Sequence, residues 1–555
     1  NFTSAAGQIK GDFVQTGIEA LTSLNSAEAF SRLVVATRQD SLIRLGNIAT
    51  VELGPQSVDA SSVFDGLKAV FVGIYATPTA NPLTVITDVR NTMPEIQAQL
   101  PPALDAAIAY DSTEFIRASI DEVARTLIEA AVIVVVVIFL FLGNLRSTLI
   151  PIVTIPLSLI GVMIMLVALG YSINLLTLLA LVLAIGLVVD DAIVVVENIY
   201  RHIEEGMTPY EASLKGAREI ALPVIAMTIT LAAVYAPIGF VSGLTGALFR
   251  EFAFTLAGSV VVSGVVALTL SPMMCSRLLR PATEQGRFVK FLDRTFDRLK
   301  VRFQRRLHRT LEFRAMTILV LVALIAMTGL LYLSTPQALA PEEDQGIVFS
   351  MVKTPQYANL DYLERTTANL YETFAKVPEQ AHVFTINGSG GVHEAFAGLL
   401  LKPWAERSRT AKEITQSLQP DLARVATGQV LAFSPPALPG STGGPPLQFV
   451  VTTTNDYQQL ATVMEQLQEA ATKSGMFLFT DTDLKFDTPQ YEFRIDSDKA
   501  NSLGISMEDV GVALGTMLGG GYVNRFNLYG RSYEVIPQVP RDFRLTADWL
   551  TRYQV

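Results

Sequence analysis

Two adjacent carboxylates lie inside one of the most apolar stretches of this 555-residue sequence. The segment GLVVDDAIVVVENIY (186–200) places Asp190 and Asp191 after an uncharged run, 175–189, and apolar residues continue beyond them to Val196. A charged side chain at this depth in a membrane costs on the order of 2.5–3.5 kcal/mol. Desolvation and the neighbouring carboxylate both favour the protonated form. The pair is therefore suited to binding and releasing protons.

The alternative interpretation is that the pair marks a helix end near the lipid headgroups. The apolar residues that follow the pair, before Glu197 and Arg201 signal the interface, argue against it. No Lys or Arg in the other predicted membrane segments is placed to neutralise the pair, so we expect a compensating cation from outside this chain. The polar residues nearest to hand are Asn174, Thr228, Thr230 and Tyr235, with Arg125 and Glu129 near the external end of the first segment.

Other chemistry has little support in the sequence. The four histidines (His202, His308, His382 and His393) have no metal-ligand spacing, which predicts no metal site. No phosphate-binding loop, GxSxG or CxxC motif is present. We therefore expect no cofactor, and an ion gradient as the energy source.

Six apolar segments set the frame for the carboxylate pair. Half of the residues are hydrophobic and only 17% are charged. About 20 helical residues cross the hydrocarbon layer, and buried helices of a soluble core would be shorter and amphipathic. The predicted membrane helices lie at 123–142, 148–169, 174–196, 221–240, 252–274 and 315–333.

Basic residues on alternate loops predict the orientation of these helices. The segment 277–314 and the loops near Arg146 and Arg201 are rich in Lys and Arg, whereas the opposite loops hold only Arg250. The basic loops are therefore expected in the cytoplasm, with regions 1–120 and 335–555 outside. Apolar residues at helical spacing within 287–310 predict an amphipathic helix on anionic lipid. The net charge of −10 gives no nucleic-acid signal.

The external regions contain a recurring plan. Segments 69–102, 346–379 and 447–475 each read as a strand, a turn and an amphipathic helix, which is half of a split βαβ unit. The segments 30–55 and 501–555 read as strand-rich hairpin regions, and 433–446 as a Pro/Gly linker. The sequence begins without Met, and we expect more sequence at both ends. The single cysteine, Cys275, is expected to stay reduced at a cytoplasmic helix end.

Several motifs resemble those of the resistance-nodulation-division (RND) efflux transporters. GLVVDDAIVVVENIYRHIEEG closely resembles the signature of their fourth helix. LAPEEDQG (339–346), TPQYEFRIDSDKANSLGIS (488–506) and LGGGYVNRF (518–526) resemble further family segments. The similarity covers essentially the whole chain. The subfamily resembles the hydrophobe/amphiphile exporters, because heavy-metal exporters typically carry Asp-Gly-Ala in place of Asp190-Asp191-Ala192.

The resemblance implies an α-helical membrane protein with α+β porter modules of split βαβ, ferredoxin-like form and strand-rich docking modules. Full members have twelve membrane helices. The implied order is part of a docking subdomain (1–55), part of a porter subdomain (56–113), family helices two to six (114–280), a cytoplasmic amphipathic helix (281–313), helix seven (314–335), porter subdomains (336–447 and 448–500) and part of a second docking subdomain (501–555).

The resemblance also implies a function. It indicates a proton antiporter rather than an enzyme, located in the inner membrane of a Gram-negative bacterium and acting as a homotrimer with a periplasmic adaptor and an outer-membrane channel. Asp190 and Asp191 match the proton-relay pair, whose lysine and threonine partners lie in a later helix. The substrates would be hydrophobic or amphiphilic small molecules. An RND-like envelope transporter of lipids or metal ions, or an assembly scaffold, is the alternative.

The resemblance also points to a substrate pocket. Relatives line their drug pockets with phenylalanines, and Phe384 in HVFTING matches one such position. The following loop, 387–398, departs from the family, with Ser389 and Gly398 where aromatic residues are common; Phe396 compensates in part. Ordinary core packing is the alternative role for either phenylalanine.

Overall fold

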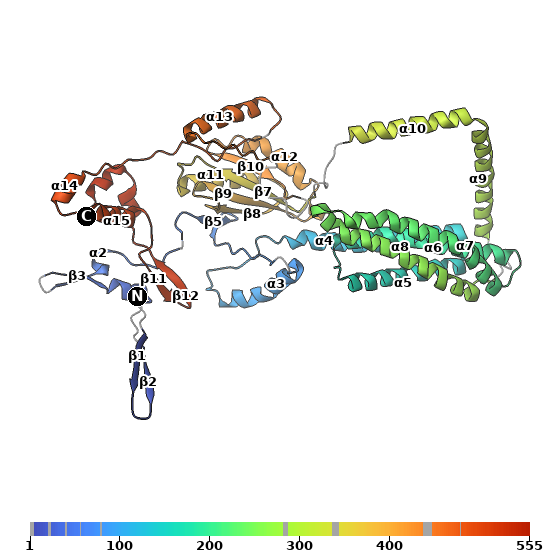
Figure 1. Ribbon diagram of the computed structural model, residues 1–555, viewed down its shortest axis with the longest axis horizontal. Coiled ribbons are helices and arrows are strands. Elements are labelled where there is room, and N and C mark those ends of the chain that lie inside the picture. The colour runs from blue at the N-terminus through green and yellow to red at the C-terminus, as the bar shows by residue number, and fades with distance from the viewer. Residues whose placement is uncertain are drawn as a thin grey trace. The chain divides into compact units, whose positions relative to one another are not determined.

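The computed structural model describes residues 5–19, 24–38, 41–55, 57–77, 80–280, 287–335, 343–436, 447–477 and 479–555. They form two compact units. One contains residues 73–346 with 435–441 and is helical; the other contains 1–72, 347–434 and 442–555 and holds the β-sheets. Figure 1 labels most of the helices and strands.

Six helices among the described residues are long and apolar enough to cross a membrane, which confirms the expectation. They extend beyond the apolar runs into polar flanks, because a helix continues wherever its backbone hydrogen bonds can. These helices are α4 (Thr113–Leu142), α5 (Leu145–Leu169), α6 (Leu175–Glu204), α7 (Pro209–Tyr235, continued by the 3-10 turn η1, Ala236–Phe240), α8 (Gly243–Leu278) and α10 (Arg314–Ser334).

Local sequence signals end and restart the membrane helices within a few residues. Gly143 and Gly170 end α4 and α5 with positive φ values of 58° and 71°, a conformation that favours glycine. Asn144, Asn174 and Thr208 then cap α5, α6 and α7 by accepting hydrogen bonds from backbone N–H groups of the first turn. These short turns hold successive helices antiparallel.

Helix α8 is the centre of the membrane bundle, where it packs against α5, α6 and α7. Small residues make this possible. At Gly258 a Cβ would collide with the Met165 side chain of α5, and at Gly264 it would lie 2.5 Å from Thr228 Oγ1 of α7. The α7–α8 crossing therefore depends on glycine at position 264, whereas the flexible end of Met165 could move aside at Gly258.

Two further helices follow the bundle. Helix α9 (Arg287–Glu312) is the predicted amphipathic helix, and its Phe296 contacts Phe141 of α4 with ring centroids 5.2 Å apart. No side chain of α10 is buried, although this helix is apolar on all sides. Of the predicted amphipathic segment, 281–286 and the side chains of 287–293 lie outside the described residues. Helix α3 (Pro82–Gln99) precedes the bundle.

The α/β unit contains a six-stranded antiparallel sheet in the order β10-β7-β9-β8-β5-β6. The succession β7-α11-β8-β9-α12-β10 with strand order β10-β7-β9-β8 is the ferredoxin-like arrangement, as expected. Strand β5, from far earlier in the chain, extends this sheet beside β8. The elements are β5 (Ser61–Phe64), β6 (Leu67–Ala69), β7 (Ile347–Lys353), α11 (Leu360–Phe374), β8 (Gln380–Asn387), β9 (Glu394–Leu401), η2 (Trp404–Glu406), α12 (Ala411–Leu422) and β10 (Gln429–Phe433).

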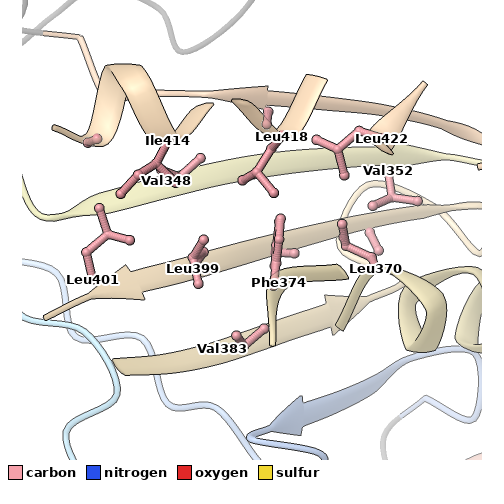
Figure 2. Packing of buried hydrophobic residues seen from close by; sticks show 14 of the residues in the cluster. Val348, Val352, Leu370, Phe374, Val383, Leu399, Leu401, Ile414, Leu418 and Leu422 are labelled. Carbon is pink, nitrogen blue, oxygen red and sulfur yellow. The ribbon is translucent and has the colours of Figure 1, made fainter. Parts of the chain in front are cut away.

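The sheet buries one face against α11 and α12. Side chains alternate along a strand, so Val348 and Val352 of β7 point to the helices while Phe349 points to the other face. Figure 2 shows the resulting core, in which Phe374 and Leu418 lie over the strands. The opposite face of the sheet carries aromatic side chains.

Three two-stranded hairpins lie toward the ends of the chain, one of them in each of the segments predicted as strand-rich, 30–55 and 501–555, although 501–555 has more residues in helices than in strands. The last of them turns through Tyr529 and Gly530, both with positive φ. The hairpins are β1 (Ala5–Lys10) with β2 (Gln15–Glu19), β3 (Val34–Arg38) with β4 (Ser41–Arg44), and β11 (Asn524–Leu528) with β12 (Arg531–Val535). The remaining elements are α1 (Ala27–Ser31), α2 (Leu45–Ile48), α13 (Tyr457–Lys473), α14 (Ser497–Ser502), α15 (Met507–Leu518), η3 (Arg541–Arg544) and η4 (Ala547–Arg552).

Two predicted strands are wrong. The helices α3 and α13 form as expected, but the described residues of 70–77 and of 447–454 contain no strand. A strand exists only where a neighbouring strand accepts and donates its backbone hydrogen bonds, and these segments have no such neighbour among the described residues. Of the predicted linker, residues 437–446 lie outside the described part of the chain.

Candidate functional site

Helix α6 carries the carboxylate pair in its middle. Asn174 and Thr177 form a reciprocal capping box at its start, and the helix then runs without interruption to Glu204. Asp190 lies 15 residues from the first helical residue, which is about 22 Å at the rise of an α-helix. The pair is therefore embedded in the helix rather than placed at its end.

The two carboxylates have different surroundings because neighbouring side chains on a helix point about 100° apart. Asp191 is 5% exposed and its Oδ2 accepts a hydrogen bond from Ser263 Oγ of α8 at 3.0 Å. The same hydroxyl lies 3.0 Å from the Val188 carbonyl oxygen. Asp190 is exposed and has no hydrogen bond or ion pair within the described residues.

Asp190 belongs to a stripe of α6 that the other described helices leave uncovered. We call it the open stripe. Its residues recur at intervals of three, four and seven, so they lie on one face. The open stripe consists of Leu179, Leu183, Gly186, Asp190, Glu197 and Arg201. Apart from Glu197 and Arg201 toward the C-terminal end of α6, Asp190 is its one polar group. A carboxylate facing lipid is costly, so this stripe requires a polar partner.

The sequence-based polar candidates do not contact the pair. Asn174 caps α6 and donates to Glu251 Oε2 at 2.6 Å, far from Asp191 along the helix. Thr230 donates to a carbonyl of its own helix, and Tyr235 packs against an apolar cluster. Thr228 lies against Gly264, with its hydroxyl buried and without a partner among the described residues.

No cation neutralises the pair among the residues that the structure describes. Arg125 and Glu129 are exposed on α4 and form no ion pair there. The compensating charge from outside the chain stays a prediction. The pair itself therefore has one internal partner, Ser263, and one unfilled side.

Sequence reasoning missed Ser263. The signal lay in GSVVVSG (258–264), where small and hydroxyl-bearing residues interrupt an apolar helix. Small residues at a membrane-helix interface let backbones approach closely, and a serine there can reach a neighbouring helix. Which helix it reaches depends on how the bundle packs, and this the spacing alone does not state.

Phe384 and Phe396 both lie on the sheet face opposite α11 and α12. Their rings are 6.2 Å apart, and Phe396 is 5.0 Å from Phe349 of β7. Phe384 is 5% exposed, whereas Phe396 is half-buried. The ring contacts continue across the sheet, which gives an aromatic band formed by Phe433, Phe349, Phe396, Phe384, Phe71 and Phe64.

Gly398 makes the aromatic band possible. It faces Phe384 across the β8–β9 pair, and a Cβ at this position would lie 2.5 Å from Phe384 Cζ. Such contacts do not occur in folded proteins, so the ring occupies space that only glycine leaves. This explains why Gly398 and Phe384 occur together although an aromatic residue is expected at position 398.

A hollow of about 140 Å³ adjoins Phe396, lined also by Met351, Lys353 and Glu394. Lys353 Nζ lies 2.9 Å from Asp481 Oδ2 and 3.3 Å from Glu394 Oε1. The hydrogen bond to Asp481 raises the pKa of Lys353. Burial alone would raise the pKa of Asp481, but the hydrogen bonds from Lys353 and Lys485 hold that pKa below its ordinary value. The lining of the hollow therefore combines one aromatic ring with an ion pair.

Six membrane-crossing helices, an intramembrane carboxylate pair and a ferredoxin-like module together define a membrane transporter of the RND class. The chain belongs to the AcrB/AcrD/AcrF family, whose sequence profile matches residues 1–555. Members of this family are transporters rather than enzymes.

Three relatives illustrate the similarity. The chain is 40% identical over 553 residues to an uncharacterized transporter of Haemophilus influenzae, covering 100% of this chain and 54% of the relative. It is 33% identical over 571 residues to multidrug export protein AcrF of Escherichia coli (98% and 55%). It is 32% identical over 565 residues to the multidrug/solvent efflux pump membrane transporter MepB of Pseudomonas putida (99% and 54%). The chain thus spans about half the length of the curated relatives it matches.

Proposed function

We propose that this chain is part of a proton-driven exporter of hydrophobic or amphiphilic small molecules. The proposal rests on the different surroundings of the two carboxylates. Asp191 is held inside the bundle by Ser263, while Asp190 lies on the open stripe of α6. Two adjacent acids with such different surroundings respond differently to one proton.

The mechanism follows from the charge on the open stripe. With Asp190 ionised, the stripe attracts a cationic side chain of a helix that packs against it. Protonation removes that attraction and leaves a stripe that is apolar through the membrane. The contact between α6 and the covering helix thus has two states, and proton binding shifts their populations.

The aromatic band is the proposed contact for the cargo. Aromatic faces bind apolar and amphiphilic molecules of varied shape through dispersion and stacking. The hollow beside Phe396 adds Lys353 and Glu394, which suit the polar end of an amphiphile. The names of the relatives AcrF and MepB, which refer to multidrug and solvent export, support this class of substrate.

The proposed setting is the inner membrane of a Gram-negative bacterium, with the α/β modules in the periplasm. The basic loops on one side of the membrane helices support this orientation. We further propose that the protein acts as a homotrimer with a periplasmic adaptor and an outer-membrane channel. The proton gradient supplies the energy, and no bound cofactor takes part.

Charge-neutral substitution of each acid tests the proposal. Asp190→Asn and Asp191→Asn in the full-length protein should each abolish export while leaving membrane insertion and assembly intact. The readouts are drug susceptibility and dye accumulation in cells that lack other pumps. Glu129→Gln is the control, because Glu129 is an exposed acid of α4, away from the open stripe, and forms no ion pair within the described residues. Normal resistance with either aspartate variant would refute proton coupling through the pair. Accumulation unchanged even by deletion of the gene would favour a lipid, metal or scaffolding role.

A further inference from the structure

Helix α9 carries a row of arginines along one side. Within its described side chains, 294–312, seven are basic and two, Asp297 and Glu312, are acidic, in a chain whose net charge is −10. Five of the arginines recur at intervals of three and four residues, so they share one side of the helix. With Asp297 and Val301 they border one open hollow of about 500 Å³. We call these five the arginine stripe: Arg298, Arg302, Arg305, Arg306 and Arg309.

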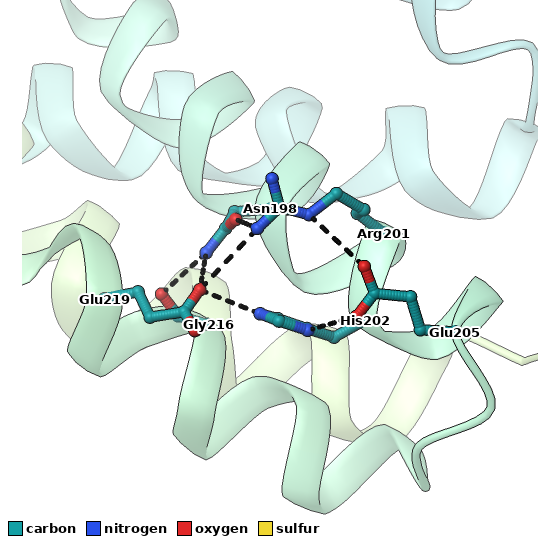
Figure 3. A network of polar contacts seen from close by, with 6 residues as sticks. All are labelled: Asn198, Arg201, His202, Glu205, Gly216 and Glu219. Atoms are coloured by element: carbon teal, nitrogen blue, oxygen red, sulfur yellow. Dashed lines mark hydrogen bonds and ion pairs between the residues drawn. The ribbon is translucent and has the colours of Figure 1, made fainter.

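The arginine stripe has no acidic partner within the described part of the chain. None of its guanidinium groups forms an ion pair or a hydrogen bond with another described residue. The C-terminal end of α6 is different, as Figure 3 shows. There Arg201 Nη2 lies 3.7 Å from Glu219 Oε2, and Nε2 of the buried His202 lies 2.8 Å from the same oxygen. Like charges one turn apart repel one another, so the arginine stripe still requires anions.

Helix α9 also has an apolar side that the described residues leave largely uncovered. Its large apolar side chains recur at intervals of three and four, and between 36% and 63% of each is exposed. We call them the apolar stripe of α9: Phe296, Leu299, Phe303 and Leu307. Leu299 precedes Arg302 by three residues, and Phe303 precedes Arg306 by three, so these pairs are neighbours on the helix surface. The apolar stripe and the arginine stripe therefore adjoin along one edge of α9.

The helices before and after α9 hold it at a membrane surface. Helix α8 ends at Leu278 and α10 begins at Arg314, and both are long and apolar enough to cross a membrane. Both ends of α9 therefore lie on the same side of the membrane. Phe296 contacts Phe141 at the end of α4, which is on that side as well because successive membrane helices alternate in direction. At the rise of an α-helix α9 is about 39 Å long, so it lies along the surface.

A leaflet of anionic phospholipid matches both stripes of α9. Its acyl chains cover the apolar stripe, and a guanidinium group binds a phosphate through two parallel N–H···O bonds. A zwitterionic headgroup brings its own cation, so the arginines gain more from an anionic one. Arg302 and Arg306 are one turn apart and border the apolar stripe, which places them at the depth of the phosphates. Arg298, Arg305 and Arg309 lie further round the helix and add to the positive potential.

We propose that the arginine stripe is a binding site for anionic phospholipid headgroups, in which Arg302 and Arg306 together hold a lipid phosphate and select an anionic headgroup over a zwitterionic one. The site is separate from the carboxylate pair and from the aromatic band. Because α9 connects α8 to α10, a lipid bound there fixes this connection on the membrane surface. The inference goes beyond the proposed export, and its test requires no transport.

The site is tested by quenching of tryptophan fluorescence in the full chain, reconstituted in vesicles of phosphatidylcholine with a minor fraction of phosphatidylglycerol. Phe303→Trp places the probe in the apolar stripe of α9, and the chain's own two tryptophans, Trp404 and Trp549, are replaced by phenylalanine. Bromine on the acyl chains of one lipid or the other shows which lipid lies beside α9. The probe should favour phosphatidylglycerol by about fivefold or more, because one basic residue near an anionic surface contributes roughly that factor.

Two double variants separate a site from a diffuse attraction. Arg302→Gln/Arg306→Gln should lose most of the preference for phosphatidylglycerol. The matched control Arg294→Gln/Arg305→Gln removes the same charge from the side of α9 farthest from the apolar stripe, and should keep most of it. Quenching in vesicles of phosphatidylcholine alone should be equal in all variants, because the apolar stripe still holds α9 on the bilayer.

Three results would overturn the proposal. Equal losses in the two double variants would show that net charge alone attracts the lipid. Equal preference for both lipids before any arginine is changed would show that the arginine stripe does not select a headgroup. Quenching by neither lipid would show that polypeptide covers the apolar stripe of α9 in place of a bilayer.

Discussion

Replacing Gly398 by phenylalanine tests the packing of the aromatic band. The new Cβ would lie 2.5 Å from Phe384 Cζ and 3.1 Å from its Cδ1, closer than packed atoms approach. The Phe384 ring cannot simply rotate away, because Phe71 and Phe396 lie 5.5 Å and 6.2 Å from it. Gly398→Phe therefore has to displace Phe384 or open the β8–β9 pair.

The size of the effect follows from overpacking. Forcing extra atoms into a packed site costs about 1–3 kcal/mol, and here the whole ring must move, so we expect the upper part of that range. Phe384→Ala leaves a cavity and costs roughly 3–5 kcal/mol. In the double variant Phe384→Ala/Gly398→Phe the new ring fills the space that the old ring leaves. The cost of the double variant should be smaller than the sum by about 1–3 kcal/mol.

The assay is thermal unfolding of the purified chain in detergent for wild type, both single variants and the double variant. Drug-susceptibility measurements on the same set would show whether export follows the packing. Gly398→Ala separates the collision of the Cβ from the volume of the ring, and should cost less than Gly398→Phe. If the loss of stability in the double variant equals the sum of the losses in the two single variants, the conclusion that glycine at position 398 makes room for Phe384 is refuted.

Two further predictions concern single polar contacts. Ser263→Ala removes the hydrogen bond to Asp191, and a hydrogen bond to a charged group contributes about 1.5–3 kcal/mol. The pH profile of export should therefore shift in this variant. Ser259→Ala is the control: it loses only a bond to the Leu256 carbonyl oxygen of its own helix and should leave the pH profile unchanged. Lys353→Met weakens the ion pair with Asp481, whose pKa lies below its ordinary value in the fold. That pair stabilises the protein, by on the order of 1 kcal/mol, above the ordinary aspartate pKa and loses its effect as pH falls through the lower folded pKa. When the pH is lowered from neutral to acidic, the thermal stability of Lys353→Met should therefore decrease less than that of the wild type. Equal decreases in the two proteins would contradict this.

The membrane part of the fold was predictable because its signals are local. An uninterrupted apolar run near twenty residues indicates a membrane helix without reference to any other part of the chain. The turns between helices are equally local: Gly143 ends one helix and Asn144 caps the next, and Gly170 and Asn174 do the same for the following pair. The two wrong strands, in contrast, depended on neighbours. A segment such as 447–454 has the alternation of a strand, but its backbone has no partner among the described residues.

The candidate sites divide in the same way. The sequence by itself determined that Asp190 and Asp191 are embedded in a membrane helix. The carboxylates and the apolar run that surrounds them belong to one segment, so their place in the helix can be read without any other part of the chain. Only the tertiary structure decided that Asp191 turns to Ser263 while Asp190 stays on the open stripe. It also decided that Phe384 rests on Gly398 and that His202 meets Glu219. These contacts join residues 14 to 72 positions apart, and their geometry is set by how helices and strands pack, which no local pattern contains.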